Sequence, residues 1–175
     1  SDQYVRATPG GVGEAKTAGN YAACNLAEKQ AQAQGFTQVL WLDAVERKYI
    51  EEVGSMNIFF VIDDEIVTPQ LNGTILPGIT RKSVLELARH WDLKTSERRI
   101  SIDEVLEGLE SGRVSEVFGA GTAAVISPVG LLHYRGQSSQ VGDGQTGPVA
   151  KRFFQHLTAI QYGRENDPFG WVETF

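Results

Sequence analysis

The chain has 175 residues, of which 41% are hydrophobic, and this is enough for one well-buried core. Its formal charge of -6 and its scattered basic residues argue against a nucleic-acid binder, because phosphate neutralisation needs clustered Lys and Arg. We find no apolar run of membrane-spanning length and no secretion signal, and the single cysteine, Cys24, cannot form an internal disulfide. A cytoplasmic protein that does not engage a membrane is therefore expected.

The first half of the chain predicts one helix followed by short strands. In chain order these are a helix over 18–34, strands over 38–43 and 49–53, and a hairpin of 57–62 with 65–68. The helix is rich in Ala, Glu, Gln and Lys, and Gly35 is a natural stop for it. The hairpin turns at Asp63-Asp64, which lacks the Gly of the most favoured two-residue turns.

The second half predicts three further helices. The expected elements are a helix that opens at 76–80, a strand over 95–100, a helix after Ser101, two strands within 116–129 around a Gly-rich break, and a helix over 148–160. Ser101 and Glu104 match the capping-box pattern, and Gly112 lies near the end of that helix. The hairpin argues against a purely parallel sheet, so we predict a single domain, 1–175, of mixed α/β (α+β) class.

Common catalytic signatures are mostly missing from the sequence. It has no Walker phosphate loop and no nucleophile-elbow serine, and His90, His133 and His156 are not at metal-ligand spacing, so metal or triad chemistry is not expected. The glycines of 10–13 do not have the dinucleotide-binding spacing. Taken singly, the remaining Gly-containing loops are ambiguous, because a lysine before a helix is usually solvated and a Gly-rich break is usually a turn.

Four ordered segments nevertheless form a recognisable set: Glu-Ala-Lys-Thr-Ala-Gly-Asn-Tyr at 14–21, Glu-Glu-Val-Gly-Ser-Met-Asn at 51–57, Leu-Pro-Gly-Ile-Thr-Arg at 76–81, and Phe-Gly-Ala-Gly-Thr-Ala-Ala at 118–124. Together they resemble the class IV aminotransferases, and the resemblance extends through essentially the whole chain. The second segment, with Gln-Val-Leu-Trp-Leu at 38–42, resembles the branched-chain amino acid aminotransferases in particular. The implied fold is the large C-terminal domain of the D-amino acid aminotransferase-like enzymes that depend on pyridoxal 5'-phosphate.

The resemblance also implies a role for each segment. Lys16 matches the lysine that binds the cofactor covalently and then moves the proton of the substrate Cα, and Tyr21 matches the tyrosine that hydrogen-bonds the cofactor's phenolic oxygen. Glu52 matches the carboxylate that faces the pyridine nitrogen, and strand alternation is expected to turn only one of Glu51 and Glu52 inward. The other implied cofactor contacts are Ser55, Leu76, Gly78, Ile79, Thr80 and Thr122, and the substrate carboxylate is assigned to Thr122 and Ala123.

The implied activity is reversible amino transfer between leucine, isoleucine or valine and 2-oxoglutarate. The alternatives are a D-amino acid aminotransferase or an aminodeoxychorismate lyase of the same fold, or a fragment that binds the cofactor without catalysis. The family's smaller N-terminal domain, which supplies an arginine to the phosphate and part of the substrate pocket, is not within 1–175, and the full protein is expected to be a homodimer. The sequence does not give the preference among the three amino acids or their 2-oxo acids.

Overall fold

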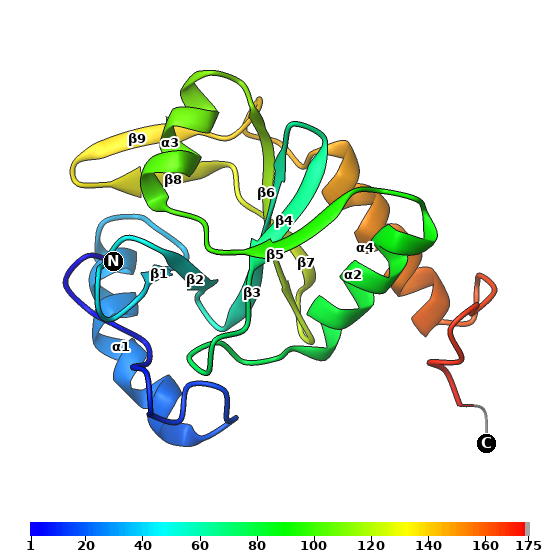
Figure 1. Ribbon diagram of the computed structural model, residues 1–175, viewed down its shortest axis with the longest axis horizontal. Helices are drawn as coiled ribbons and strands as arrows, with labels where there is room; N and C mark the ends of the chain where they lie inside the picture. The colour runs from blue at the N-terminus through cyan, green and yellow to red at the C-terminus, as the bar shows by residue number, and fades with distance from the viewer. Residues whose placement is uncertain (174–175) are drawn as a thin grey trace.

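The computed structural model describes residues 1–173, which form a central sheet with helices around it (Figure 1). In chain order the elements are α1 (Ala18–Ala33), β1 (Leu40–Leu42), β2 (Ile50–Val53), β3 (Met56–Ile62), β4 (Glu65–Pro69), α2 (Ile79–His90), β5 (Thr95–Arg98), α3 (Ile102–Glu110), β6 (Val114–Gly121), β7 (Val125–Pro128), β8 (Leu131–Tyr134), β9 (Gln137–Gln140) and α4 (Pro148–Gln161). No helix among these described residues has the length and apolar character that a membrane crossing requires.

Strand β3 is the centre of the seven-stranded sheet. β6 runs antiparallel along one edge of β3, while β2 pairs with the beginning of β3 and β4 with its end on the other edge. Among the described strands only β4 and β5 pair in parallel, and β8 and β9 form a separate hairpin. The mixed α/β class predicted from the sequence is thereby confirmed, and the sheet is not of the doubly wound parallel type.

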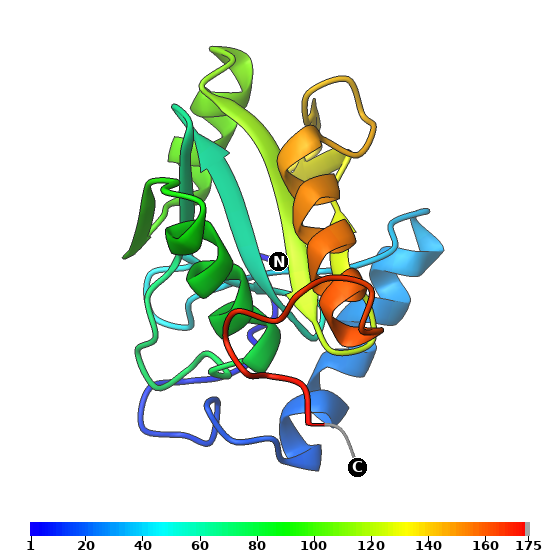
Figure 2. The same cartoon turned by 90° about the vertical axis from the view of Figure 1, so that its right-hand side faces the viewer.

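The alternation of side chains along β3 divides the core into two layers. Ile58 and Phe60 pack on the face that α3 and the β8–β9 hairpin cover, and Phe59 and Val61 pack on the face that α2 and α4 cover. These four side chains are at most 4% exposed, and burying each contributes about 1.5–3 kcal/mol. Figures 1 and 2 show α2 and α4 together on one side of the sheet, with α3 on the other.

A third, smaller cluster holds α1 against the sheet. Cys24 and Ala27 of α1 pack on Val39 and Trp41, and the Trp41 indole N–H donates to the carbonyl of Gly54 at 2.9 Å. Trp41 is fully buried. Because α1 begins two residues after Lys16, this cluster fixes where the Lys16 loop lies.

The predicted helices and the first hairpin are confirmed to within a few residues. The Ser101 hydroxyl caps α3 by accepting from the Glu104 amide at 3.0 Å, as the capping box predicts. The turn between β3 and β4 forms without glycine because Asp63 and Asp64 both adopt positive φ, 49° and 61°, as a type I′ turn requires. The β8–β9 hairpin was not predicted, although its turn, Arg135-Gly136, also has two positive φ angles.

Candidate active site

Glu52 is a buried carboxylate whose two oxygens are both held. It is 2% exposed in β2; its Oε2 lies 2.6 Å from Nε of Arg6, and its Oε1 accepts from the backbone N–H of Leu76 at 2.8 Å. Burial raises the pKa of Glu52 to about 7, against the opposing effects of Arg6 and of the Leu76 amide, while the negative charge of Glu51 raises it further. Glu52 is therefore an oriented acid poised near neutral pH.

Arg6 connects Glu52 to two loops. Its Nη1 donates to the carbonyl of Thr74 at 2.8 Å, and its Nη2 donates to the carbonyl of Gly13 at 3.1 Å. The two loops are in direct contact, because a Cβ added at Gly13 would lie 2.6 Å from the Thr74 carbonyl oxygen. The loop before α1, which carries Lys16, is thus packed against the loop that precedes α2.

The expectation that only one of the two adjacent glutamates points inward was wrong. Glu51 is 3% exposed and Glu52 is 2% exposed. They leave β2 on opposite sides, but the loop after β4 folds over both: the Thr74 hydroxyl donates to Glu51 Oε1, and the Leu76 amide donates to Glu52. Burial also raises the pKa of Glu51.

The N-terminus of α2 offers backbone donors that no side chain occupies. Its N-cap is Gly78, which has no side-chain cap, whereas Ser101 caps α3 and the carboxylate of Glu116 accepts from two amides at the start of α4, each at 2.8 Å. The first N–H groups of a helix have no partner within the helix. Those of Ile79 and Thr80 can therefore bind an anion, with support from the helix dipole.

Asn57 brings the start of α2 next to Glu52. In the sheet Asn57 lies opposite Glu52 on β2 and opposite Ala120 on β6, so the three residues form one row across three strands. The Asn57 side-chain amide donates to the carbonyl of Leu76 at 2.8 Å, and a Cβ on Gly78 would overlap the Asn57 Oδ1. Three of the four predicted segments therefore meet at this row.

Lys16 belongs to the remaining segment, residues 14–21. It is exposed and directly precedes Thr17, the N-cap of α1. Its loop is fixed by Asn20, whose side-chain amide donates to the carbonyls of Val12 at 2.8 Å and Ala15 at 2.9 Å. Tyr21 is half-buried on the first turn of α1. The structure gives Lys16 no hydrogen bond or ion pair within residues 1–173.

The remaining predicted residues lie in exposed turns beside this row. Ser55 is in the two-residue turn between β2 and β3, and Thr122 and Ala123 are in the turn between β6 and β7. Gly121 allows these turns to approach, because a Cβ at this position would lie 3.0 Å from the side chain of Met56.

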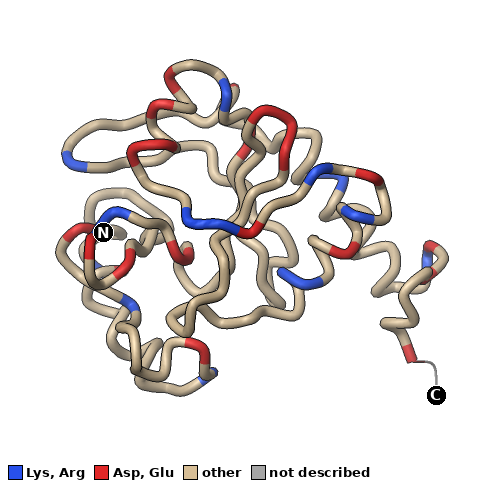
Figure 3. The backbone as a smooth tube through the Cα atoms, in the orientation of Figure 1, with Lys and Arg blue, Asp and Glu red and all other residues tan. Residues whose placement is uncertain are grey.

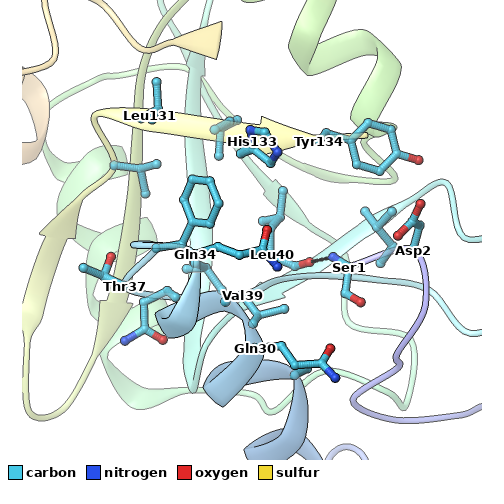
Figure 4. Close-up of a pocket in the computed structure, with 18 of the residues that line it drawn as sticks. Ser1, Asp2, Gln30, Gln34, Thr37, Val39, Leu40, Leu131, His133 and Tyr134 are labelled. Atoms are coloured by element: carbon cyan, nitrogen blue, oxygen red, sulfur yellow. Dashed lines mark hydrogen bonds between the residues drawn. The ribbon is translucent and has the colours of Figure 1, made fainter. Parts of the chain in front are cut away.

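A large cleft in the described part of the chain lies away from this row. It has a volume of about 600 Å³ and contains none of the predicted site residues. It lies between the end of α1, residues 1–4 and β8, with Gln34, Leu131 and His133 among its lining side chains (Figure 4). We place the candidate site at the Glu52 row instead, because the buried charges and free amides are there.

Residues 2–132 match the family model described as amino-transferase class IV. The chain belongs to this family. It is 56% identical over 170 residues, 97% of its length, to branched-chain-amino-acid aminotransferase 2 of Bacillus subtilis, and 55% identical over 97% to a probable branched-chain-amino-acid aminotransferase of Staphylococcus aureus. Its fold matches the branched-chain amino acid aminotransferase of Escherichia coli with a TM-score of 0.83 at 34% identity, covering 98% of this chain and 53% of that one.

A second structural match is the branched-chain amino acid aminotransferase of Thermobaculum terrenum in its PLP-form, with a TM-score of 0.78 at 25% identity over 93% of this chain and 50% of that one. The chain spans about half the length of the curated relatives it matches, 47% and 48% for the two named above.

The sequence motifs gave no role to two residues that contact the buried glutamates of the site. Arg6 and Thr74 lie outside the residues given a role, although Thr74 is only two residues before Leu76. Neither has a local signal: an arginine before a Gly-rich loop and a threonine in a polar loop are ordinary, and only the fold places both of them on buried glutamates. Figure 3 shows that Lys and Arg are otherwise spread over several elements.

Proposed function

We propose that the full-length protein is a branched-chain amino acid aminotransferase that transfers an amino group reversibly between leucine, isoleucine or valine and 2-oxoglutarate, with pyridoxal phosphate as cofactor. The names of the relatives support this proposal. The observation that carries it is the row of Glu52, Asn57 and Ala120, at which a buried carboxylate lies beside uncapped helix amides. One protein surface thus offers a site for a cationic ring nitrogen and a site for a phosphate.

The residues present fit this cofactor. Lys16 would supply the amine that binds it covalently, Glu52 would accept from its ring N–H, and the Tyr21 hydroxyl would donate to its phenolic oxygen. Its phosphate is assigned to the amides of Ile79 and Thr80, with Leu76, Gly78, Ser55 and Thr122 as further contacts. Glycine at position 78 suits this role, because a side chain there would collide with Asn57.

Pyridoxal phosphate, when bound, supplies an electron sink that makes the substrate Cα–H acidic. The protein's own groups then decide which proton moves. An ionised Glu52 keeps the ring nitrogen protonated, and this allows the ring to accept electron density. Lys16, with its amine free, would act through Nζ as the base that accepts the proton of the substrate Cα.

The substrate carboxylate is assigned to the backbone amides of Thr122 and Ala123, which lie in the exposed β6–β7 turn. Backbone amides bind a carboxylate without added positive charge, so the chain's net charge of -6 is compatible with an anionic substrate. We further propose that the part of the protein outside 1–175, together with a second copy in a homodimer, completes the substrate pocket.

The test is amino transfer by the purified full-length protein, measured as glutamate formed from 2-oxoglutarate with leucine, isoleucine or valine. Lys16→Ala should abolish both the transfer and the visible absorption band of the lysine-bound cofactor. The matched control is Lys29→Ala, which removes another exposed lysine of the same region from α1 and should retain both.

Other substrates separate the alternatives of the same fold. Transfer from D-alanine in place of leucine would identify a D-amino acid aminotransferase, and pyruvate released from aminodeoxychorismate would identify the lyase. A Lys16-dependent band without turnover of any of these substrates would identify a cofactor-binding protein without catalysis. A full-length protein with no Lys16-dependent band would overturn the proposed function altogether.

A further inference from the structure

Arg6 has a set of contacts that the proposed reaction does not yet use. All three of its guanidinium nitrogens are engaged: Nε with Glu52, Nη1 with Thr74, and Nη2 with Gly13. Its side chain is 4% exposed and that of Glu52 is 3% exposed. A buried ion pair is costly to desolvate and is weak evidence for a stabilising role by itself, so stability alone does not assign a role to Arg6.

The surroundings of Glu52 make Arg6 its cationic neighbour. In the sheet Glu52 lies between Trp41 of β1 and Asn57 of β3, which are both neutral, and the covering loop over 70–78 has no charged residue. Glu51, the other charged group that acts on Glu52, is negative. Without the guanidinium, burial and Glu51 would both favour the protonated form of Glu52.

The hydrogen bonds of Glu52 leave it free acceptor capacity. Each carboxylate oxygen has two lone pairs, and on Glu52 one oxygen uses one for Arg6 while the other uses one for the Leu76 amide. Each oxygen keeps one acceptor direction. Arg6 thus holds the carboxylate in place without consuming its capacity to accept from a ring N–H. Its bond to Gly13, three residues before Lys16, fixes the same carboxylate relative to the anchor loop.

We propose that Arg6 is a positioning residue for the cofactor, which keeps Glu52 ionised and aimed at the ring nitrogen at a fixed distance from the Lys16 loop. This inference rests on the proposed function and deepens it. It assigns to Arg6 a role through Glu52 and not through direct contact with substrate. Arg6 therefore matters more for a cofactor whose ring carries a nitrogen than for one whose ring does not.

The test compares two probes on cofactor-free, full-length protein: pyridoxal phosphate, and its 1-deaza analogue, in which CH replaces the ring nitrogen. The readout is the ratio of their dissociation constants. In Arg6→Gln the affinity for pyridoxal phosphate should fall by about tenfold or more beyond any fall for the analogue, the scale of a hydrogen bond to a charged group, so the ratio of the two constants changes by about that factor. Arg81→Gln is the matched control: Arg81 is also buried and paired with a glutamate, Glu97 at 2.7 Å, and its loss should leave the ratio unchanged.

Arg6→Lys covers the case in which Arg6→Gln does not fold. A lysine keeps the charge beside Glu52 but cannot hold Thr74 and Gly13 as well, so it should restore most of the preference for pyridoxal phosphate. Equal losses for both probes in Arg6→Lys would show that Arg6 only braces the two loops, and an unchanged ratio in a folded Arg6→Gln would also overturn the inference. If unmodified protein lacks a Lys16-dependent band, the proposed function fails instead, whatever Arg6 does.

Discussion

Replacing Gly78 by alanine should test how the start of α2 is held beside Glu52. The backbone at Gly78, with φ -66° and ψ 139°, suits alanine, but the new Cβ would overlap Oδ1 of Asn57. The Asn57 side chain must turn away, and it then loses its hydrogen bond to the carbonyl of Leu76. A buried carbonyl left without its partner costs about 1–3 kcal/mol.

Alanine in place of glycine also restricts the unfolded chain, which stabilises the fold by about 0.4–1 kcal/mol. The expected net effect of Gly78→Ala is therefore a loss of about 1–2 kcal/mol in the free energy of unfolding. In an Asn57→Ala background the obstacle and the hydrogen bond are both gone, so the same substitution should be neutral or stabilising.

Urea unfolding of the four proteins of this double-mutant cycle measures both effects, provided that the dependence on urea is the same in each. A loss of the same size in both backgrounds would refute the reasoning, because it would place the strain in the backbone of α2 and not in the contact with Asn57. The Gly78→Ala protein should also bind pyridoxal phosphate more weakly, since the amides of Ile79 and Thr80 follow directly.

Two further predictions concern buried glutamates. Glu116→Gln removes a charged cap from the first amides of α4 and should lower the free energy of unfolding by about 1–2 kcal/mol without changing cofactor affinity, whereas Glu110→Gln, on an exposed residue of α3, should change neither. Burial raises the folded-state pKa of Glu52 from 4.5 to about 7, so the folded state favours protonated Glu52. The contribution of Glu52 to the stability of the cofactor-free fold is therefore full below pH 4.5 and is lost as the pH rises to about 7. The difference in unfolding free energy between unmodified protein and Glu52→Gln should therefore change within that window, and a constant difference from about pH 4 to about pH 8 would contradict it.

Local sequence patterns were sufficient to predict most of the helices and strands. The Ser101 cap and the stop at Gly35, where φ is 85°, are set by neighbours in the sequence, so the helices they delimit were predicted nearly to the residue. The β8–β9 hairpin was missed because its strand residues carry little alternation: β9 is Gln-Ser-Ser-Gln, polar throughout. The packing of Leu132 and Tyr134 against the core, which is not visible in the local pattern, makes this hairpin part of the fold.

The motifs of the candidate site could be read from the sequence, but the contacts between them could not. Lys16, Glu52, Ile79 and Thr122 were assigned roles through motifs that are local in sequence, and those roles stay predictions. The connections have long sequence separations: Arg6 to Glu52 spans 46 residues by their numbering, and Asn57 to Leu76 spans 19. Alternation along β2 also failed to predict that both Glu51 and Glu52 are buried, because alternation describes the strand and not the loop that covers it.

The arrangement of charge around β2 explains why a cation would bind beside Glu52. Two adjacent buried glutamates share one nearby arginine, and burial raises the pKa of both acids, so at least one of them lacks a positive partner that would stabilise its ionised form. Such a site is costly to keep empty and favourable to fill with a cation. A protonated ring nitrogen beside Glu52 would bring the missing positive charge, and the same charge would favour the ionised form of Glu52 that the reaction needs. Under the proposed function, stability given up in the empty site would become affinity for the protonated form of the cofactor, and Arg6 would set how much of it is given up.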